Sequence, residues 1–465
     1  MPLPAPFQAR MQARLGAAYA HFAASLAEPA RVSLRLNPAK LAFQPDLPRV
    51  PWATQGYYLP ERPLFTLDPW LHAGGYYVQE ASSMLLEQAI SQHLPTDTPC
   101  LALDLCGAPG GKSTHLSSLL PAGSLLVSNE VIRSRSHILT ENLQKWGSAA
   151  LVTQRNPSAL GQAGAQFDLL VIDAPCSGEG LFRKDPAAME HWSEEALQHC
   201  AARQRRILSD VWPALKPGGL LVYSTCTFHP SENEANLAWL AREHPVESLP
   251  LSLDPAWGFE PVETEGLSGY YALPHRVQGE GFFLAVLRKG GTPDQGRKRL
   301  PKRLPWPSVP RSTRDTLATW IQPEADALWL MQGETVCRLP GGFEAELAAL
   351  WPHGPIVQAG LALAEVKQKD LRPTPALALS PALRSEAFPQ VALSLDDAIA
   401  YLRKADLGTG LDATGWCRVA FEGLALGWVK ALPRRVNNYY PPHWKIRMGH
   451  RPGEPVAFGL RNMRP

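Results

Sequence analysis

The sequence predicts an α/β protein whose core is a Rossmann-type, doubly wound sheet. Two observations support this fold class: short apolar runs alternate with segments of helical periodicity between residues 100 and 290, and polar or glycine-rich motifs follow several of the runs. Apolar runs of this length are typical of strands covered by helices on both faces, so the alternation indicates parallel βαβ units. In such sheets ligands bind beyond the carboxyl ends of the strands, which makes the motifs at those ends the candidate sites.

Six apolar runs are the predicted strands of this sheet. They span residues 100–106, 124–130, 150–154, 167–173, 219–226 and 281–289. Before the fifth run, apolar residues recur at helical spacing from Leu197 to Leu215 after an acidic first turn, and we expect residues 216–219 to end this helix. Residues 231–234 (Ser-Glu-Asn-Glu) are predicted to be the capping box of the helix that follows the fifth strand.

Further segments flank this core, because the chain of 465 residues exceeds one ordinary domain of about 100–200 residues. The clearest boundary is a stretch rich in proline and basic residues after the sixth strand. The predicted parts are an N-terminal α/β segment, the sheet core, a basic proline-rich linker, a small α/β module and a β-rich C-terminal module, at residues 1–72, 73–290, 291–310, 311–390 and 391–465.

Composition excludes several classes of protein. Hydrophobic residues make up 45% and charged residues 19%, as in folded domains, and a formal net charge of +2 does not by itself indicate a nucleic-acid partner. No apolar run approaches the roughly 18 residues that span a bilayer, and the N-terminus has no signal-peptide pattern, so we expect a cytoplasmic protein without membrane contact. The seven cysteines form no CxxC pair, which argues against a disulfide framework and against a metal site.

The first motif follows the first predicted strand and reads Asp-Leu-Cys-Gly-Ala-Pro-Gly-Gly-Lys-Ser at 104–113. Its glycines permit close backbone approach to a ligand, and Glu130, at the end of the second strand, is placed to bind ribose hydroxyls. A tight strand–helix turn without a ligand is the structural alternative. A P-loop ATPase is the sharper alternative, but Cys106 replaces the first glycine of that motif, and Pro109 removes a backbone N–H that would bind phosphate.

Two cysteines follow the fourth and fifth predicted strands. Cys176 lies in Asp-Ala-Pro-Cys-Ser-Gly at 173–178 and Cys226 in Ser-Thr-Cys-Thr at 224–227. Because these strands are expected to be parallel neighbours, both thiols should face one cleft, although a lone cysteine at a strand end is usually a small buried apolar residue. A thiolate added to C6 of a cytosine would activate C5 toward an electrophilic methyl group, and a second group must then help to remove the C5 proton and release the product. Asp173 is the candidate for a hydrogen bond to N3 of that ring, with a structural role in the turn as its alternative.

These motifs resemble the signature blocks of the NOL1/NOP2/Sun family of RNA m5C methyltransferases. The similar blocks are 104–112, 173–178 and 224–227, with the upstream segments 75–83 and 35–38. The resemblance covers roughly residues 30–290, and among bacterial members the architecture is most similar to the F type of 16S ribosomal RNA methyltransferases. It implies an S-adenosyl-L-methionine-dependent enzyme that forms 5-methylcytidine in 16S ribosomal RNA. A transfer RNA m5C methyltransferase and a non-catalytic RNA-binding assembly factor remain the alternatives.

The resemblance also implies roles for individual residues. Cys226 would be the nucleophile and Cys176 would assist product release, with Asp173 and Lys184 in support. The implied contacts to S-adenosyl-L-methionine are Cys106, Gly107, Ala108, Pro109, Gly110, Gly111, Lys112, Glu130, Arg135, Asn156 and Asp173. Asn156 departs from the family, which commonly has an aspartate there, but an amide oxygen can still accept a hydrogen bond from the adenine amino group.

The C-terminal region is expected to hold the RNA. Residues 423–453 contain no acidic residue and interleave basic with aromatic side chains, a mixture that suits single-stranded or irregular RNA. The predicted RNA-binding residues are Arg434, Arg435, Tyr439, Tyr440, Trp444, Lys445 and Arg447. An ordinary basic surface over a β-rich core is the alternative. The region resembles the PUA-like module of ribosomal RNA members. We expect a monomer that binds ribosomal RNA, free or within the small ribosomal subunit, with the N-terminal segment also facing RNA.

Overall fold

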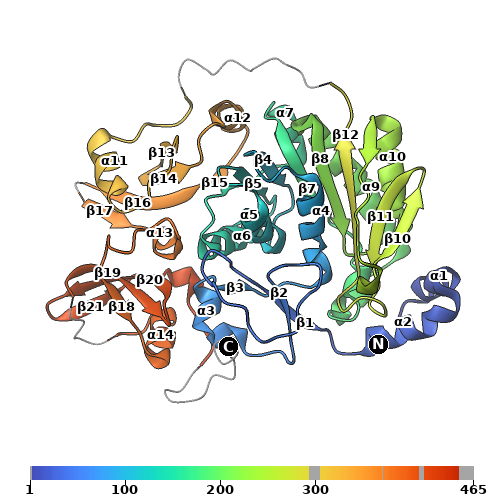
Figure 1. The fold of residues 1–465 in the computed structure, drawn as a ribbon, viewed down its shortest axis with the longest axis horizontal. Coiled ribbons are helices and arrows are strands. Elements are labelled where there is room, and N and C mark those ends of the chain that lie inside the picture. The colour runs from blue at the N-terminus through green and yellow to red at the C-terminus, as the bar shows by residue number, and fades with distance from the viewer. Residues whose placement is uncertain (1–2, 293–303, 369, 408–412, 450–465) are drawn as a thin grey trace.

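The computed structural model describes residues 3–292, 304–368, 370–407 and 413–449 (Figure 1). Its centre is a ten-stranded sheet, in which nine strands follow the order β10-β11-β12-β8-β7-β4-β5-β6-β15 and the tenth, β9, pairs with β12. The six predicted strands all belong to this sheet as β4 Leu101–Asp104, β5 Leu125–Asn129, β6 Leu151–Thr153, β7 Phe167–Asp173, β8 Leu215–Thr225 and β12 Phe282–Lys289. The strands β8, β7, β4, β5 and β6 are parallel to one another. The predicted Rossmann-type fold class is confirmed.

Helices cover both faces of the sheet. The helices α4 Leu86–His93, α5 Gly111–Leu119 and α6 Arg133–Trp146 pack on one face, and α7 Pro157–Gln162, α9 Glu194–Val211 and α10 Glu234–Glu243 pack on the other. The strand residues alternate between two apolar clusters, so that Leu101 and Leu103 belong to the cluster that contains α9 while Ala102 belongs to the cluster that contains α4. This two-sided burial explains why the strands read as continuous apolar runs.

Antiparallel strands close the sheet at both edges. One edge is formed by β9 Val246–Ser248, β10 Glu260–Thr264 and β11 Leu267–Ala272. The other edge is β15 Ile356–Ala359, which pairs with β6 although it lies about 200 residues later in the chain. The segment 311–390 therefore shares the core sheet.

Two local predictions are wrong. The helix before β8 ends at Val211 and continues as a 3-10 turn, Trp212–Ala214, so β8 already begins at Leu215 and includes residues 216–219. The predicted capping box does not form, because Pro230–Glu232 is a 3-10 turn and Asn233 is the N-cap of α10. The Asn233 side chain instead accepts a hydrogen bond from Thr225 Oγ1, which ties the helix start to the end of β8.

The N-terminal segment has two parts. The helices α1 Ala5–Leu15 and α2 Tyr19–Ala27 pack their buried phenylalanines, Phe7 and Phe22, into the core cluster beside Phe228. A three-stranded sheet of β1 Val32–Leu36, β2 Gly56–Leu59 and β3 Tyr76–Tyr77 follows, with α3 Pro69–His72 between β2 and β3. β3 pairs with β1, so this small sheet extends past residue 72.

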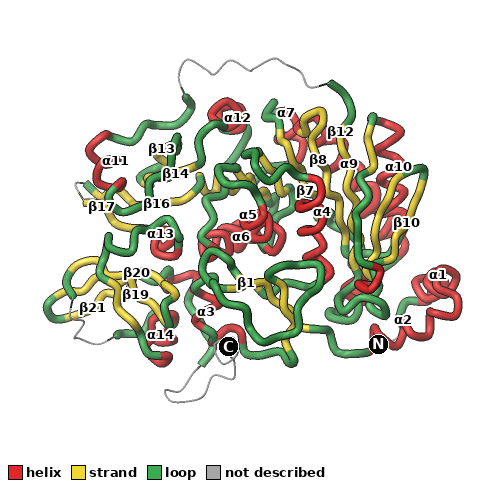
Figure 2. The backbone as a smooth tube through the Cα atoms, viewed as in Figure 1, coloured by secondary structure: helices red, strands yellow, loops and turns green. Residues whose placement is uncertain are grey.

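The C-terminal third forms two four-stranded sheets (Figure 2). The first contains β13 Leu328–Gln332, β14 Thr335–Leu339, β16 Leu361–Lys367 and β17 Asp370–Pro373, with α11 Arg311–Ala318, α12 Glu344–Leu350 and α13 Pro375–Leu379. The second contains β18 Gln390–Ala392, β19 Gly415–Phe421, β20 Leu424–Leu432 and β21 Arg435–Asn438, with α14 Leu395–Leu402. The β-rich C-terminal region is thus confirmed. Most of the predicted basic linker, at 293–303, and residues 450–465 lie outside the described residues. Among the described helices, none has the length and apolar character needed to cross a membrane.

Candidate active site

The glycine-rich loop connects β4 to α5. Gly110 has a φ of +123°, and a Cβ there would lie 3.2 Å from Asn142 Cβ. A Cβ on Gly107 would lie 2.8 Å from Ser113 Oγ. Both positions therefore require glycine, one for its backbone conformation and one for space. Asn142 Nδ2 donates to the Pro109 carbonyl, so α6 holds the outer side of the loop.

A buried carboxylate lies beneath this loop. Asp104 is fully buried, and its Oδ2 accepts a 2.5 Å hydrogen bond from Ser113 Oγ, whereas its Oδ1 has no hydrogen-bond partner among the described residues. Burial raises the pKa of Asp104 to about 6. An orphaned carboxylate oxygen at a glycine cradle suits a ligand with cationic or N–H groups.

Glu130 and Arg135 lie beside the first part of the loop. Glu130 follows β5 and is 3% exposed, and its Oε1 accepts from the Ile132 amide. Arg135 Nη1 is 3.4 Å from Glu130 Oε2, and Arg135 Nη2 donates to the Ala108 carbonyl. The structure thus brings these two predicted cofactor residues to the loop. Asn156 is exposed at the N-cap of α7, and its side chain makes no capping bond.

Lys112 carries the positive charge of the cleft. Its Nζ lies 2.9 Å from Asp173 Oδ2, while Asp173 Oδ1 accepts from Ser224 Oγ. Burial opposes the charge of Lys112, but the neighbouring carboxylates of Asp173 and Asp104 raise its pKa. The ammonium is therefore held charged close to Cys226, to which it is electrostatically coupled. A lysine engaged in this way does not extend toward phosphate groups as in a P-loop.

The two predicted thiols are in contact, with Cys176 Sγ 3.1 Å from Cys226 Sγ. This proximity follows from the sheet, since Asp173 and Ser224 are register partners on β7 and β8, and the Gly180 amide donates to the Cys226 carbonyl. The hydrogen bond to Cys226, followed by burial, raises the pKa of Cys176 far above its ordinary value. Cys176 therefore keeps its proton and can donate it in a hydrogen bond to the sulfur of Cys226.

A buried carboxylate holds the Cys176 loop in place. Glu232 accepts hydrogen bonds from the Ser177 amide, from Ser177 Oγ and from Gln204 Nε2. Burial raises the pKa of Glu232, although the bonds from Ser177 oppose this shift. Sequence reasoning missed this residue because it assigned 231–234 to a helix cap. The available signal was a carboxylate six residues after the second cysteine.

A second carboxylate joins the N-terminal helices to the same loops. Glu179 is fully buried, pairs with Arg10 of α1 at 2.6 Å and accepts from the Phe228 amide. This contact spans 169 residues of sequence, so local patterns could not have revealed it. The first helix therefore buttresses the loops that carry both thiols.

Lys184 lies outside this network. It is exposed and lines a cavity of about 520 Å³ together with Arg31, Arg62, Glu80 and Arg183. Arg183 is itself paired with Glu280 at 2.8 Å, which leaves Lys184 as a cation on the wall of a cleft between the N-terminal sheet and the core. The structure does not bring Lys184 into hydrogen-bond contact with either thiol.

The C-terminal candidates divide into two groups. Arg434, Arg435, Lys445 and Arg447 are exposed, and the first two lie at the β20–β21 hairpin. Tyr440 and Trp444, in contrast, are 0% and 5% exposed and belong to an apolar cluster with α14 and β20. The prediction that these two rings stack on RNA is wrong, because their faces are already packed inside the protein. Tyr439 is half-buried, with its ring centroid 4.5 Å from that of Trp416.

Comparisons with known proteins identify the family of this chain. Family models described as 16S rRNA methyltransferase RsmB/F, the N-terminal domain of 16S rRNA methyltransferase RsmF and the methyltransferase RsmF PUA domain match residues 93–288, 3–81 and 388–446. The ribosomal RNA small subunit methyltransferase F of Pectobacterium atrosepticum is 32% identical over 94% of both chains. That of Citrobacter koseri is 34% identical over 90% of this chain and 91% of its own.

The core is also similar to a solved structure. A methyltransferase homolog protein from Pyrococcus horikoshii is 27% identical, with a TM-score of 0.50 over 62% of this chain and 100% of its own. The predicted resemblance is confirmed across almost the whole sequence. The chain belongs to the ribosomal RNA small subunit methyltransferase F family.

Proposed function

We propose that this protein transfers a methyl group from S-adenosyl-L-methionine to C5 of a cytidine in 16S ribosomal RNA, through a covalent bond between Cys226 and C6. The observation that carries the proposal is the 3.1 Å contact between Cys176 and Cys226 at the carboxyl ends of β7 and β8. Two thiols with different tasks fit cytosine C5 chemistry, in which a sulfur must add to the ring and a second group must help to remove a proton.

The cofactor region fits the proposed methyl donor. The loop has no Cβ at positions 107 and 110, and glycines of this kind let a ligand approach the backbone closely. The carboxylates of Glu130, Asp104 and Asp173 suit the ribose hydroxyls, the amino group and the sulfonium of this donor. The same negative charges would repel the phosphates of a nucleotide. When bound, S-adenosyl-L-methionine would supply an electrophilic methyl group.

Cys226 acts first in the proposed mechanism. Its thiolate adds to C6 of the cytosine, and Lys112 stabilises the negative sulfur because its ammonium is held nearby by Asp173. Asp173, together with its partner Lys112, lies on the N3 side of the ring in this mechanism and accommodates the charge that addition creates. The activated C5 can then accept the methyl group.

Cys176 acts second. In the free protein its proton is held by the hydrogen bond to Cys226, which is the largest cause of its raised pKa. Once Cys226 is bonded to C6, the hydrogen bond between the two sulfurs is lost, and in this mechanism Cys176 releases its proton to solvent. The Cys176 thiolate then takes the C5 proton, and the electrons of that C–H bond expel Cys226.

Ribosomal RNA is the proposed substrate over transfer RNA because the N-terminal, core and C-terminal segments all match ribosomal RNA methyltransferases. We propose that the protein acts as a monomer on this RNA, free or in the small subunit.

The decisive experiment supplies labelled S-adenosyl-L-methionine and RNA from cells that lack the gene. We expect label in 16S ribosomal RNA and, after nucleoside digestion, 5-methylcytidine by mass spectrometry. Label in transfer RNA would show that transfer RNA is the substrate instead, and label in another nucleoside would refute the cytosine chemistry. Calorimetric titration with ATP and magnesium, which we expect to show no binding, tests the ATPase alternative. RNA binding without methyl transfer would instead indicate an assembly factor.

A further inference from the structure

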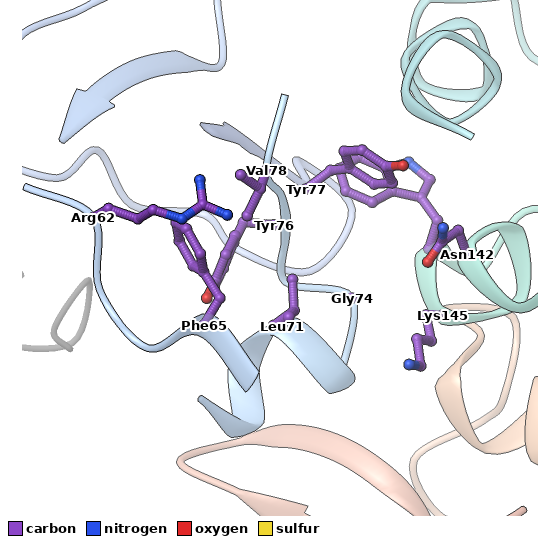
Figure 3. Close-up of a pocket in the computed structure, with 10 residues that line it drawn as sticks. Arg62, Phe65, Leu71, Gly74, Tyr76, Tyr77, Val78, Asn142 and Lys145 are labelled. Carbon is purple, nitrogen blue, oxygen red and sulfur yellow. The ribbon is translucent and has the colours of Figure 1, made fainter. Parts of the chain in front are cut away.

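A second pocket lies on the outer side of the glycine-rich loop, between the N-terminal sheet and the end of α6 (Figure 3). It has a volume of about 290 Å³. Its lining combines aromatic rings with cations and one amide, from Arg62, Tyr76, Tyr77, Asn142, Lys145 and Trp146. In Figure 3, Arg62 projects from one side of the pocket, and Asn142 and Lys145 lie on the other. This pocket is separate from the thiol cleft.

The charge of the pocket is positive, since no carboxylate belongs to its lining. Arg62 is exposed, with its guanidinium 5.5 Å from the Phe65 ring centroid, and the described residues give it no ion pair. Lys145 is paired with Glu141 at 2.5 Å, which partly compensates its charge. Arg62 is therefore the cation most available to an anionic ligand.

The pocket adjoins a larger cavity between the N-terminal sheet and the core. It shares Arg62 and Val78 with the larger cavity that Lys184 lines. Its opposite wall contacts the cofactor loop, because Asn142 bonds the Pro109 carbonyl and the Tyr77 ring lies 3.5 Å from a Cβ built on Gly111. A strand that passes through the larger cavity can therefore place a neighbouring residue here.

We propose that this pocket binds one unpaired nucleotide of the RNA substrate, distinct from the target cytidine, with its base against Tyr77 and its phosphate on Arg62. This inference rests on the proposed RNA substrate. Aromatic rings accept any base by stacking, and an arginine without an ion pair neutralises phosphate. Such a subsite would help to hold the strand while the target base is unstacked, a step that costs free energy.

The test measures binding of a 16S ribosomal RNA transcript by Arg62→Gln across a range of salt concentrations. We expect affinity to fall about three- to ten-fold, and the slope of log K against log salt to fall by about 0.7, the value for one phosphate contact on a single strand. The control is Arg49→Gln, because Arg49 is also exposed and lies over a ring, Tyr57, of the same small sheet but outside the pocket. Arg49→Gln should bind as the wild type does, and both variants should bind S-adenosyl-L-methionine normally.

Cross-linking locates the contact directly. A transcript containing 4-thiouridine, irradiated on the wild-type protein, should attach to peptides that contain Tyr77 or Trp146. The proposal is overturned if Arg62→Gln keeps wild-type affinity and salt slope, or if cross-links avoid both peptides. These readouts do not require methyl transfer, so a failure of the proposed enzymatic reaction would be seen separately, as an absence of product with the unaltered protein.

Discussion

The thiol cleft and the C-terminal basic stretch were both predicted from sequence as ligand-binding regions. The predicted residues of the cleft lie together, whereas two of the predicted residues of the stretch are buried. In the cleft, Cys176 and Cys226 meet at 3.1 Å because β7 and β8 are parallel neighbours in register. In the C-terminal stretch, the cations are exposed but Tyr440 and Trp444 are buried. The positions of residues at strand ends depend on sheet topology, and the alternation of apolar runs and helical segments in the sequence predicts that topology. Whether an aromatic ring faces solvent depends on packing partners far away in the sequence.

The largest effect is expected for the nucleophile of the cleft. Cys226→Ala should lower methyl transfer by about 10⁴-fold or more and should form no covalent RNA adduct, because the proposed nucleophile is then absent. Cys176→Ala should also lose turnover but should leave an RNA–protein complex that survives denaturing electrophoresis. The measurement is labelled-methyl transfer together with gel mobility.

The two variants control each other, since each removes one of two sulfurs in the same contact. A Cys176→Ala protein that turns over normally would contradict the division of roles while leaving the activity itself intact. A Cys226→Ala protein that still traps RNA would exchange the two roles.

The next effect concerns the packed rings of the C-terminal stretch. Tyr440→Ala should lower the free energy of unfolding of this region by about 3–5 kcal/mol, as expected for truncation of a fully buried aromatic residue. Urea unfolding followed by tryptophan fluorescence measures the change. Arg435→Ala is the control, since an exposed side chain should alter stability by less than about 0.5 kcal/mol. If Tyr440→Ala weakened RNA binding without loss of stability, our assignment of this ring to the core would be wrong.

Features that depend on local sequence patterns could be predicted, and features that depend on distant contacts could not. The six core strands and the cleft residues could be predicted because apolar runs and strand-end motifs are local patterns. The edge strand β15 could not, because it pairs with β6 from about 200 residues away. Glu179 and its partner Arg10 escaped for the same reason, since a buried ion pair across the fold has no local signature. The burial of Trp444, whose ring lies under Lys145 of α6, likewise depends on a distant element.

A smaller effect is expected on the free energy of unfolding, because a charged carboxylate is buried in the cleft. Asp104 has a folded-state pKa of about 6, above its ordinary value of 3.8. Between these values the folded state binds more protons than the unfolded state, so stability falls as the pH rises through this window. Asp104→Asn removes this dependence while its amide oxygen can still accept from Ser113. The variant should therefore be more stable than the wild type by about 1–3 kcal/mol at pH 7, and this difference should shrink toward pH 4.

Urea unfolding at several pH values between 4 and 7 measures this difference. A stability difference that stays constant over this range would show that Asp104 is not the titrating group. The cleft would then lack the electrostatic penalty that separates it from the C-terminal surface.

The smallest effect is expected at the exposed cations of the C-terminal stretch. Replacing Arg434 and Arg435 by glutamine should leave stability unchanged and should lower the salt slope of RNA binding by about 0.7 for each phosphate that these arginines neutralise. Arg311→Gln is the control, because Arg311 is 95% exposed but lies on α11, outside the stretch. If the double variant binds RNA with the wild-type slope, the basic hairpin is an ordinary solvated surface, and RNA recognition must be sought along the cleft beside the thiols. If the slope falls, the exposed half of the predicted C-terminal site binds RNA through charge alone, without the buried rings.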